Sequence, residues 1–142
     1  MKVCVSACLL GCNCKYNGGN NLNDKVVRFV KDKDVVPVCP EQLGGLPTPR
    51  TPSEIVNGRV TTKDGKDVDA AFRHGALLAA QEAVSAGVEL AILKSRSPSC
   101  GAKQIYDGTF TGTLVDGKGV FAQALAERGI PIIDEADDSL LV

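Results

Sequence analysis

The sequence has little of several features that would point to a common function. It contains one histidine, His74, and its formal net charge is -1, with 16 lysine and arginine residues against 17 aspartate and glutamate residues. Histidine-rich zinc chemistry is therefore disfavoured. A balanced charge without a basic stripe argues against tight, salt-driven binding of nucleic acid. No apolar run approaches the roughly 20 residues that a membrane span needs.

Motifs that identify frequent protein classes are also missing. No CxxC pair occurs, which argues against a thioredoxin-like motif or a zinc ribbon. No G-x-G-x-x-G or Walker sequence follows the first expected strand, which counts against a dinucleotide site. There is no internal repeat or linker. The apolar stretch at the N-terminus is too short for a signal peptide, so we expect a cytoplasmic protein in which residues 1–142 form a single domain.

Four short aliphatic runs predict the strands of a parallel sheet, because none alternates cleanly between apolar and polar residues. These runs are residues 2–7, 34–38, 90–94 and 130–134. Helical patterns lie between them, at residues 22–33, 67–87 and 119–129, and Asn23 or Asp24 is the expected N-cap of the first. Strands that alternate with helices predict a Rossmann-like or flavodoxin-like three-layer α/β domain with a mainly parallel sheet.

Irregular segments interrupt this alternation. Residues 40–54 contain four of the seven prolines, and we expect them to form an ordered surface loop. Asn57-Gly58 is a strong hairpin signal, and residues 105–119 predict a second small hairpin. We interpret these segments as insertions that surround a functional site.

The cysteines indicate where that site lies. Cys8, Cys39 and Cys100 each come just after the carboxyl end of a predicted strand, where ligands bind in open parallel sheets. With the common strand order 2-1-3-4, these three strands are neighbours about 4.8 Å apart, so we expect the three thiols to converge. Cys4, within the first strand, is expected to be a core residue.

Converging thiolates favour an iron–sulfur cluster, zinc or copper(I). Cys39 and Cys100 lie in loops rich in proline, glycine and serine, where we expect no core to bury them. A [4Fe-4S] cluster held by three cysteines would leave one iron open to substrate. Cys12 and Cys14 could supply a fourth ligand or none, and we interpret His74 as an ordinary helix-surface residue.

Five short motifs occur in order along nearly the entire chain. They are SACLLG (6–11), CKYNGG (14–19), PVCPE (37–41), GGLPTPR (44–50) and KSRSPSCG (94–101). Together they resemble the thiouracil desulfidase family. The resemblance implies a [4Fe-4S] cluster on Cys8, Cys39 and Cys100, and non-redox removal of sulfur from thiolated nucleobases. In that chemistry the thiocarbonyl sulfur binds the open iron, water attacks the ring carbon, and sulfur leaves as sulfide.

The resemblance also implies catalytic roles for Glu41 and Ser97, with Ser99 as the alternative serine. Glu41 follows a predicted cluster ligand by two residues and can act as general base for the attacking water. Ser97 can donate a hydrogen bond to developing negative charge. Asn17 departs from the family pattern, which often has aspartate at this place, so any proton transfer by that carboxylate would be missing here.

Two other classes of function stay open on the sequence alone. One is a metal- or nucleotide-binding module without turnover, and the other is a metal-free cysteine-dependent hydrolase or sulfur carrier. Lys94 and Arg96 could hold an anionic product or a phosphate, or be surface charges. The expected partners are a small thiolated nucleobase or nucleoside, such as 2-thiouracil or 4-thiouracil, and the product sulfide. The charge balance does not favour RNA, no membrane partner is expected, and the oligomeric state is not predicted.

Overall fold

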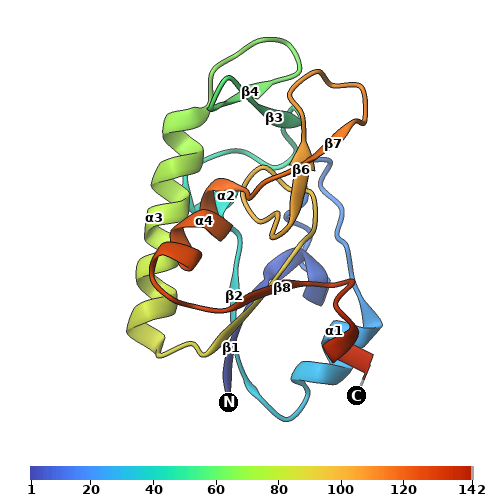
Figure 1. Ribbon diagram of the computed structural model, residues 1–142, viewed down its shortest axis with the longest axis vertical. Helices are drawn as coiled ribbons and strands as arrows, with labels where there is room; N and C mark the ends of the chain where they lie inside the picture. Colours follow the sequence, from blue (N-terminus) through green and yellow to red (C-terminus); the bar gives the residue numbers. More distant parts are fainter. Residues whose placement is uncertain (142) are drawn as a thin grey trace.

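A four-stranded parallel sheet lies at the centre of the protein, which a computed structural model describes over residues 1–141 (Figure 1). Its strands have the order β2-β1-β5-β8, and all three pairings are parallel. They are β1 (Lys2–Ser6), β2 (Asp34–Val38), β5 (Leu90–Leu93) and β8 (Ile132–Asp134). The predicted order of the four strands is confirmed.

Helices cover both faces of this sheet and give the three layers that the sequence predicts (Figure 1). On one face lie α3 (Asp69–Ala86) and α4 (Val120–Glu127), with Phe72 and Phe121 fully buried between helices and sheet. On the other lie α1 (Asp24–Val30) and the 3-10 helix η2 (Asp138–Leu141). No helix within residues 1–141 combines the length and apolar character that crossing a membrane requires.

Burial on both faces explains the continuous apolar character of the strands. In β1, Cys4 packs into the cluster beneath α3 and α4, whereas Val3 and Val5 pack into the cluster beneath α1. A strand with two covered faces needs apolar residues at every position, so no alternation appears. Cys4 is 0% exposed, as expected of a core residue. Asn23 is the N-cap of α1, since its Oδ1 accepts a hydrogen bond from Val26 N at 3.1 Å.

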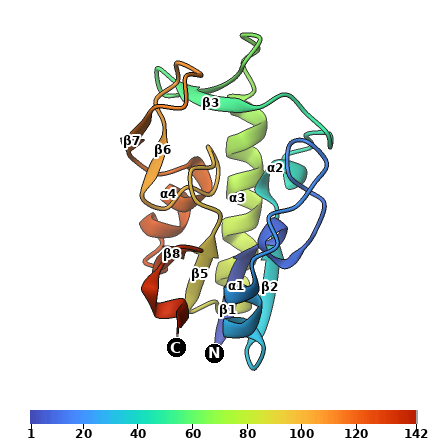
Figure 2. The same cartoon turned by 90° about the vertical axis from the view of Figure 1, so that its right-hand side faces the viewer.

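Two hairpins extend beyond the carboxyl ends of the strands (Figures 1 and 2). The first pairs β3 (Ser53–Val56) with β4 (Arg59–Thr62). Its turn residues Asn57 and Gly58 both have positive φ, 49° and 77°, as a type I′ turn requires. The second pairs β6 (Gln104–Tyr106) with β7 (Leu114–Asp116). Both predicted hairpins are therefore present.

The segment 40–54 differs from the predicted surface loop. It begins with a single helical turn, α2 (Pro40–Leu43), which packs against α3, and it ends within β3. Pro40 stands at the first position of α2, where its missing N–H costs no hydrogen bond. The 3-10 helix η1 (Ala7–Leu10) was likewise not predicted. Elements of one turn are too short to produce an apolar period, so they leave no pattern in the sequence.

Glycines let α2 lie close against α3. A Cβ on Gly75 would lie 1.8 Å from the carbonyl oxygen of Pro40, and a Cβ on Gly44 would lie 2.1 Å from that of Ala71. Both distances are far below a van der Waals contact, so only glycine permits this approach. The contact sets the position of the residues on either side of Pro40.

The first prediction concerns this contact. Alanine is normally preferred over glycine inside a helix by about 1 kcal/mol, yet Gly75→Ala is expected to lower the free energy of unfolding by about 1–3 kcal/mol, because overpacking forces the backbone apart. Denaturant titration measures the change. Gln81→Ala, at an exposed position of the same helix, is the control and should stay within about 0.5 kcal/mol of wild type. A Gly75→Ala protein of undiminished stability would show that α2 can shift without cost.

Candidate functional site

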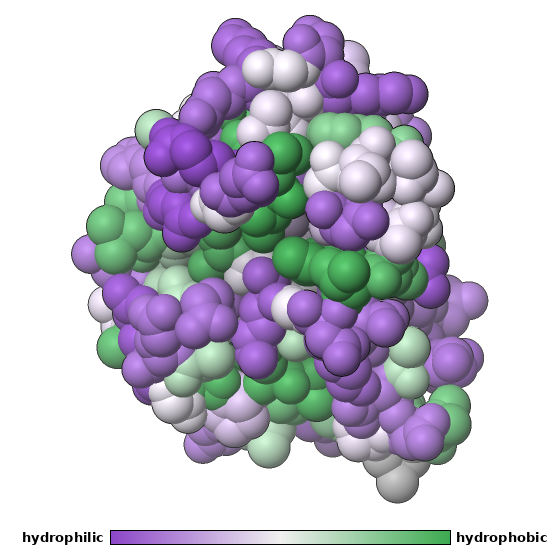
Figure 3. Space-filling model, turned by 45° about the horizontal axis from the view of Figure 1, so that its top comes forward, coloured by the Kyte–Doolittle hydropathy of each residue, from purple (hydrophilic) through white to green (hydrophobic). Residues whose placement is uncertain are grey.

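A cavity of about 410 Å³ opens at the carboxyl ends of β1, β2 and β5. The chain runs from β1 to β2 on one side and returns to β5 on the other side of β1, so the strand order reverses here. Open α/β sheets bind ligands at such a switch point. Figure 3 shows this end of the molecule turned forward, with apolar surface recessed among hydrophilic side chains.

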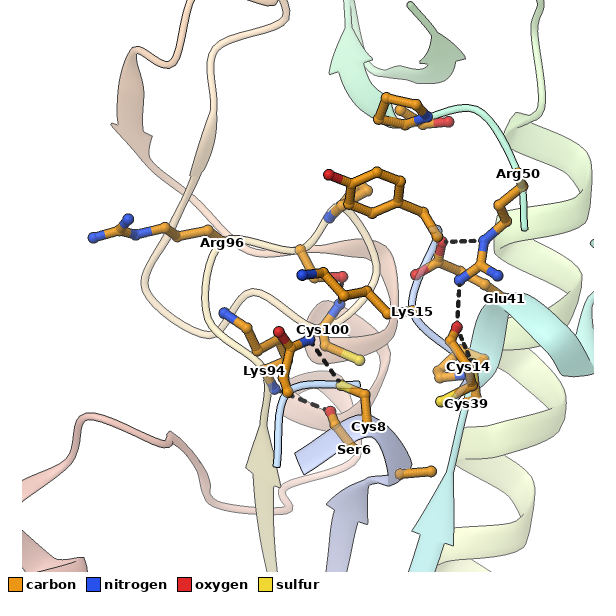
Figure 4. A pocket seen from close by; sticks show the side chains of 18 of the residues that line it. Ser6, Cys8, Cys14, Lys15, Cys39, Glu41, Arg50, Lys94, Arg96 and Cys100 are labelled. Carbon is orange, nitrogen blue, oxygen red and sulfur yellow. Dashed lines mark hydrogen bonds and ion pairs between the residues drawn. The ribbon is translucent and has the colours of Figure 1, made fainter. Parts of the chain in front are cut away.

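The structure brings the three predicted cysteines to this cavity (Figure 4). Cys8 lies on η1, Cys39 is the N-cap of α2, and Cys100 lies in the loop after β5. All three are free thiols. The expectation that the loop would not bury Cys100 is wrong: it is 5% exposed and belongs to the core cluster beneath α4, because the N-terminus of α4 packs over its loop.

A fourth cysteine, Cys14, also lines the cavity and is buried, whereas Cys12 is exposed and does not line it. Cys14 lies beside Cys39. The thiol of Cys14 donates to ionised Cys39, which raises the pKa of Cys14 and lowers the pKa of Cys39. When Cys39 is protonated, its Sγ instead donates weakly to the carbonyl oxygen of Cys14 at 3.9 Å. The sequence left the role of Cys14 open, because the spacing of the cysteines along the chain does not indicate that Cys14 lies beside Cys39.

Burial is the largest influence on the pKa of the other two predicted ligands, Cys8 and Cys100. It raises the pKa of Cys100, and it raises the pKa of Cys8, although a hydrogen bond of 3.4 Å from Asn21 Nδ2 to Cys8 Sγ opposes the shift. Thiols must lose their protons to bind a metal, and binding supplies the positive charge that displaces those protons. Cys39 is the thiol of the three that ionises most easily.

The chemistry of these thiols limits which metal group they could hold. Within residues 1–141 no three histidine, cysteine, aspartate or glutamate side chains are arranged to hold a single metal ion. A single zinc ion binds each sulfur at about 2.3 Å, so its ligands must almost touch. In an iron–sulfur cluster the thiolates bind different irons, so the sulfurs stand farther apart. Soft thiolates are the donors that such a cluster takes, so the three thiols at this cavity fit it by their chemistry.

The loop that follows β5 is held from behind by α4. Two amides of the helix, Phe121 N and Ala122 N, donate to the carbonyl oxygen of Ser99 at 2.8 and 3.0 Å. A Cβ on Gly119, the N-cap of α4, would lie 2.5 Å from the same oxygen. The helix thus uses its unpaired N-terminal amides to fix the loop.

A chain of hydrogen bonds joins this loop to α2. The Oγ of Ser99 donates to Glu41 Oε2 at 3.1 Å and lies 3.0 Å from Ser97 Oγ. Cys100 Sγ, at 3.7 Å, is a second and more distant acceptor for Ser99 Oγ. When Ser99 gives its one hydrogen to Glu41, the hydrogen between the two hydroxyls comes from Ser97. Ser97 Oγ also accepts from Ser99 N at 3.1 Å and Cys100 N at 3.0 Å. Ser97 lines the cavity, whereas Ser99 is fully buried behind it.

Arg50 pairs with the other oxygen of Glu41, with Nε 3.1 Å from Oε1. Our sequence reasoning did not select Arg50, although it ends the GGLPTPR motif. Of the two predicted anion-binding residues, Lys94 pairs with Glu135 at 3.2 Å, and Arg96 is exposed and points away from the cysteines (Figure 4).

Two further predicted positions lie elsewhere. Asn17, where the family often has aspartate, and His74 are both exposed, and neither lines the cavity. The interpretation of His74 as a helix-surface residue is confirmed, since it lies on α3.

The parallel sheet, covered on both faces and carrying a thiol-lined cavity at its switch point, defines an α/β protein of the doubly wound class. More particularly, the chain belongs to the 2-thiouracil desulfurase family, whose model matches residues 3–137. It is 38% identical to the uncharacterized protein YbbK of Bacillus subtilis (strain 168), over 94% of this chain and 95% of that protein. The resemblance noted from the motifs is confirmed.

A solved structure, that of the [4Fe-4S]-dependent thiouracil desulfidase TudS, is also similar. It shares 39% sequence identity with this chain, and the TM-score is 0.88 over 94% of this chain and 90% of that one. The predicted α/β fold with a parallel sheet and small hairpins is confirmed.

The second prediction concerns Ser97 as a structural residue. Ser97→Ala leaves two loop amides without an acceptor, so the free energy of unfolding of the metal-free protein should fall by about 1–3 kcal/mol. Ser85→Ala, at an exposed position of α3, is the matched control. Unchanged stability of Ser97→Ala would mean that water replaces the hydroxyl at both amides.

Proposed function

We propose that this protein is an enzyme that removes sulfur from thiolated nucleobases of the 2-thiouracil or 4-thiouracil type, giving the oxo base and sulfide with the help of a [4Fe-4S] cluster. One observation carries the proposal: the free thiols of Cys8, Cys39 and Cys100, from separate segments of the chain, line one cavity together with a carboxylate and a serine. Membership of the 2-thiouracil desulfurase family supports it. The cavity volume of about 410 Å³ suits a small ligand.

Cys8, Cys39 and Cys100 would hold the cluster. Soft thiolates are its usual ligands, and three of them leave one iron without a protein ligand. When bound, the cluster supplies a Lewis acid that polarises the carbon–sulfur bond of the substrate. The remaining chemistry, which is proton transfer, falls to the side chains around the thiols.

Glu41 is the proposed general base. Its carboxylate lines the cavity at 18% exposure, so it can take a proton from the water that attacks the ring carbon. The hydrogen-bonded hydroxyls of Ser99 and Ser97 lead from Glu41 Oε2 back to the cavity wall. Return of that proton would reverse both hydroxyls: Glu41 would donate to Ser99, Ser99 to Ser97, and Ser97 to negative charge that develops on the substrate. Ser99 would relay the proton without touching substrate.

The metal-free hydrolase is the weaker alternative. A cysteine nucleophile needs an adjacent base, and the single histidine, His74, lies exposed on α3. The two oxygens of Glu41 are bonded to Ser99 and Arg50. Neither of these bonds involves a thiol, so no cysteine of the cavity is paired with the adjacent base that a cysteine nucleophile needs.

An anaerobic assay tests the proposed function directly. Protein reconstituted with iron and sulfide is incubated with 2-thiouracil, 4-thiouracil or 4-thiouridine, and the oxo product and released sulfide are both measured. Stoichiometric amounts of the two are expected. Turnover by the metal-free protein would favour the hydrolase, and no turnover by cluster-loaded protein would favour a binding module.

The third prediction concerns the ligands. Cys8→Ala, Cys39→Ala and Cys100→Ala are each expected to lose the cluster, because each removes one of three iron ligands; iron content and visible absorption measure it. Cys4→Ala is the matched control, since this buried thiol lies in the core. It should keep its iron while losing on the order of 1 kcal/mol of stability. Unchanged iron in any of the first three variants removes that residue from the ligand set.

The fourth prediction concerns Glu41. Glu41→Gln keeps the shape of the side chain but cannot accept a proton at neutral pH, so turnover should fall about 10²–10⁴-fold. Iron content and thiobase binding should stay near wild type. Near-normal turnover would contradict the general-base role, and loss of iron would make Glu41 a structural or iron-binding residue.

A further inference from the structure

Glu41 is held at both of its oxygens, one bonded to Ser99 and the other to Arg50. We propose that Arg50 is a positioning residue that holds the Glu41 carboxylate in the orientation needed at the cavity. The inference builds on the proposed role of Glu41 as general base.

The guanidinium of Arg50 is itself fixed by several partners. Its Nη1 donates to Thr48 Oγ1 at 3.0 Å and to the carbonyl oxygen of Pro47 at 3.3 Å, and its Nη2 donates to that of Cys14 at 2.9 Å. The side chain is 8% exposed. A guanidinium is planar and rigid, so contacts at both Nη atoms determine the direction of Nε. Nε points at Glu41 (Figure 4).

The backbone of Arg50 adds a further tie to the same neighbourhood. Its amide donates to the carbonyl oxygen of Tyr16 at 2.6 Å. Arg50 thus joins the segment 14–16, the segment 47–50 and α2, and its orientation is set before any substrate enters. Groups oriented in advance need no rearrangement during the reaction, which is the condition for efficient proton transfer.

Glu41 needs such support because of its place in the fold. It lies on α2, a single turn of helix, and its side chain extends toward the cavity from there. Ser99 bonds only Oε2, which leaves the carboxylate free to turn about that contact. A misplacement of about 1 Å can cost on the order of 10²-fold in rate. Without Arg50, the Glu41 carboxylate would still lie at the cavity but would no longer be fixed in the orientation that proton transfer needs.

The competing explanation is that Arg50 only stabilises the loops. A double-mutant cycle separates the two explanations, because residues that act through each other are not additive. If Arg50 acts through Glu41, then adding Arg50→Met to a protein that already carries Glu41→Gln should lower kcat only slightly. A purely structural role would lower the rate by the same factor in both backgrounds.

The fifth prediction follows from this cycle. Arg50→Met is expected to lower kcat about 10–100-fold with a smaller change in KM, and to keep its iron. In the Glu41→Gln background it should lower kcat less than about threefold, within the usual error of additivity. Arg59→Met is the matched control: Arg59 pairs with Asp67 at 2.6 Å outside the cavity and is 60% exposed, so its kcat should match wild type.

A second variant keeps the test decisive if Arg50→Met does not fold. Arg50→Lys keeps the charge but cannot contact Glu41, Thr48 and Cys14 together, so its kcat should fall between those of Arg50→Met and wild type, with iron content and melting temperature retained. A kcat equal to wild type in Arg50→Lys, or equal losses in both backgrounds of the cycle, would overturn the proposal.

A crystal structure distinguishes failure of this inference from failure of the proposed function. Wild-type protein that released no sulfide from any thiobase would contradict the function alone. The inference would then be decided by the position of Glu41 in crystals of cluster-loaded Arg50→Lys. A carboxylate rotated about its contact with Ser99, so that Oε1 has left the position it has beside Arg50, supports it, and one left in place contradicts it.

Discussion

The contact between α2 and α3 determines where the chemistry of this protein can occur. Gly75 and Gly44 let the backbones of the two helices approach to a distance that no side chain permits. That approach places Cys39, the N-cap of α2, and Glu41, its second residue, at the same edge of the cavity. A single turn of helix has little stability of its own, so α2 depends on this packing.

The other wall of the cavity is fixed by a different device. The N-terminal amides of α4 hold the carbonyl oxygen of Ser99, and Ser97 Oγ accepts from two amides within the loop. Among the described residues no buried polar side-chain atom lacks a hydrogen-bond partner. The two walls meet where Ser99 Oγ donates to Glu41. The site is therefore held in place by packing on one side and by hydrogen bonding on the other.

The sequence predicts the parts of this arrangement that depend on local chemistry. Apolar runs between helical patterns indicated the four strands. With the order common in such sheets, the positions of Cys8, Cys39 and Cys100 after those strands predicted that the three thiols converge. The turn at Asn57-Gly58 was predictable because few residues adopt positive φ. Cys14 and Arg50 could not be found in this way. Their places depend on contacts with residues far away in the chain, and neither lies in an element whose period would reveal which way it faces.

The origin of the three thiols in separate loops has a consequence for the order of assembly. Cys8 and Cys39 follow adjacent strands, but Cys100 reaches them only after α3 has crossed the sheet and β5 has paired with β1. Contacts between residues so far apart in the chain form late, because closing the intervening loops costs entropy first. Joint binding of one ligand by all three thiols in their native places therefore requires that β1, β2 and β5 have paired first. A nascent chain would pass through most of its synthesis with these thiols separate and exposed to other reactions.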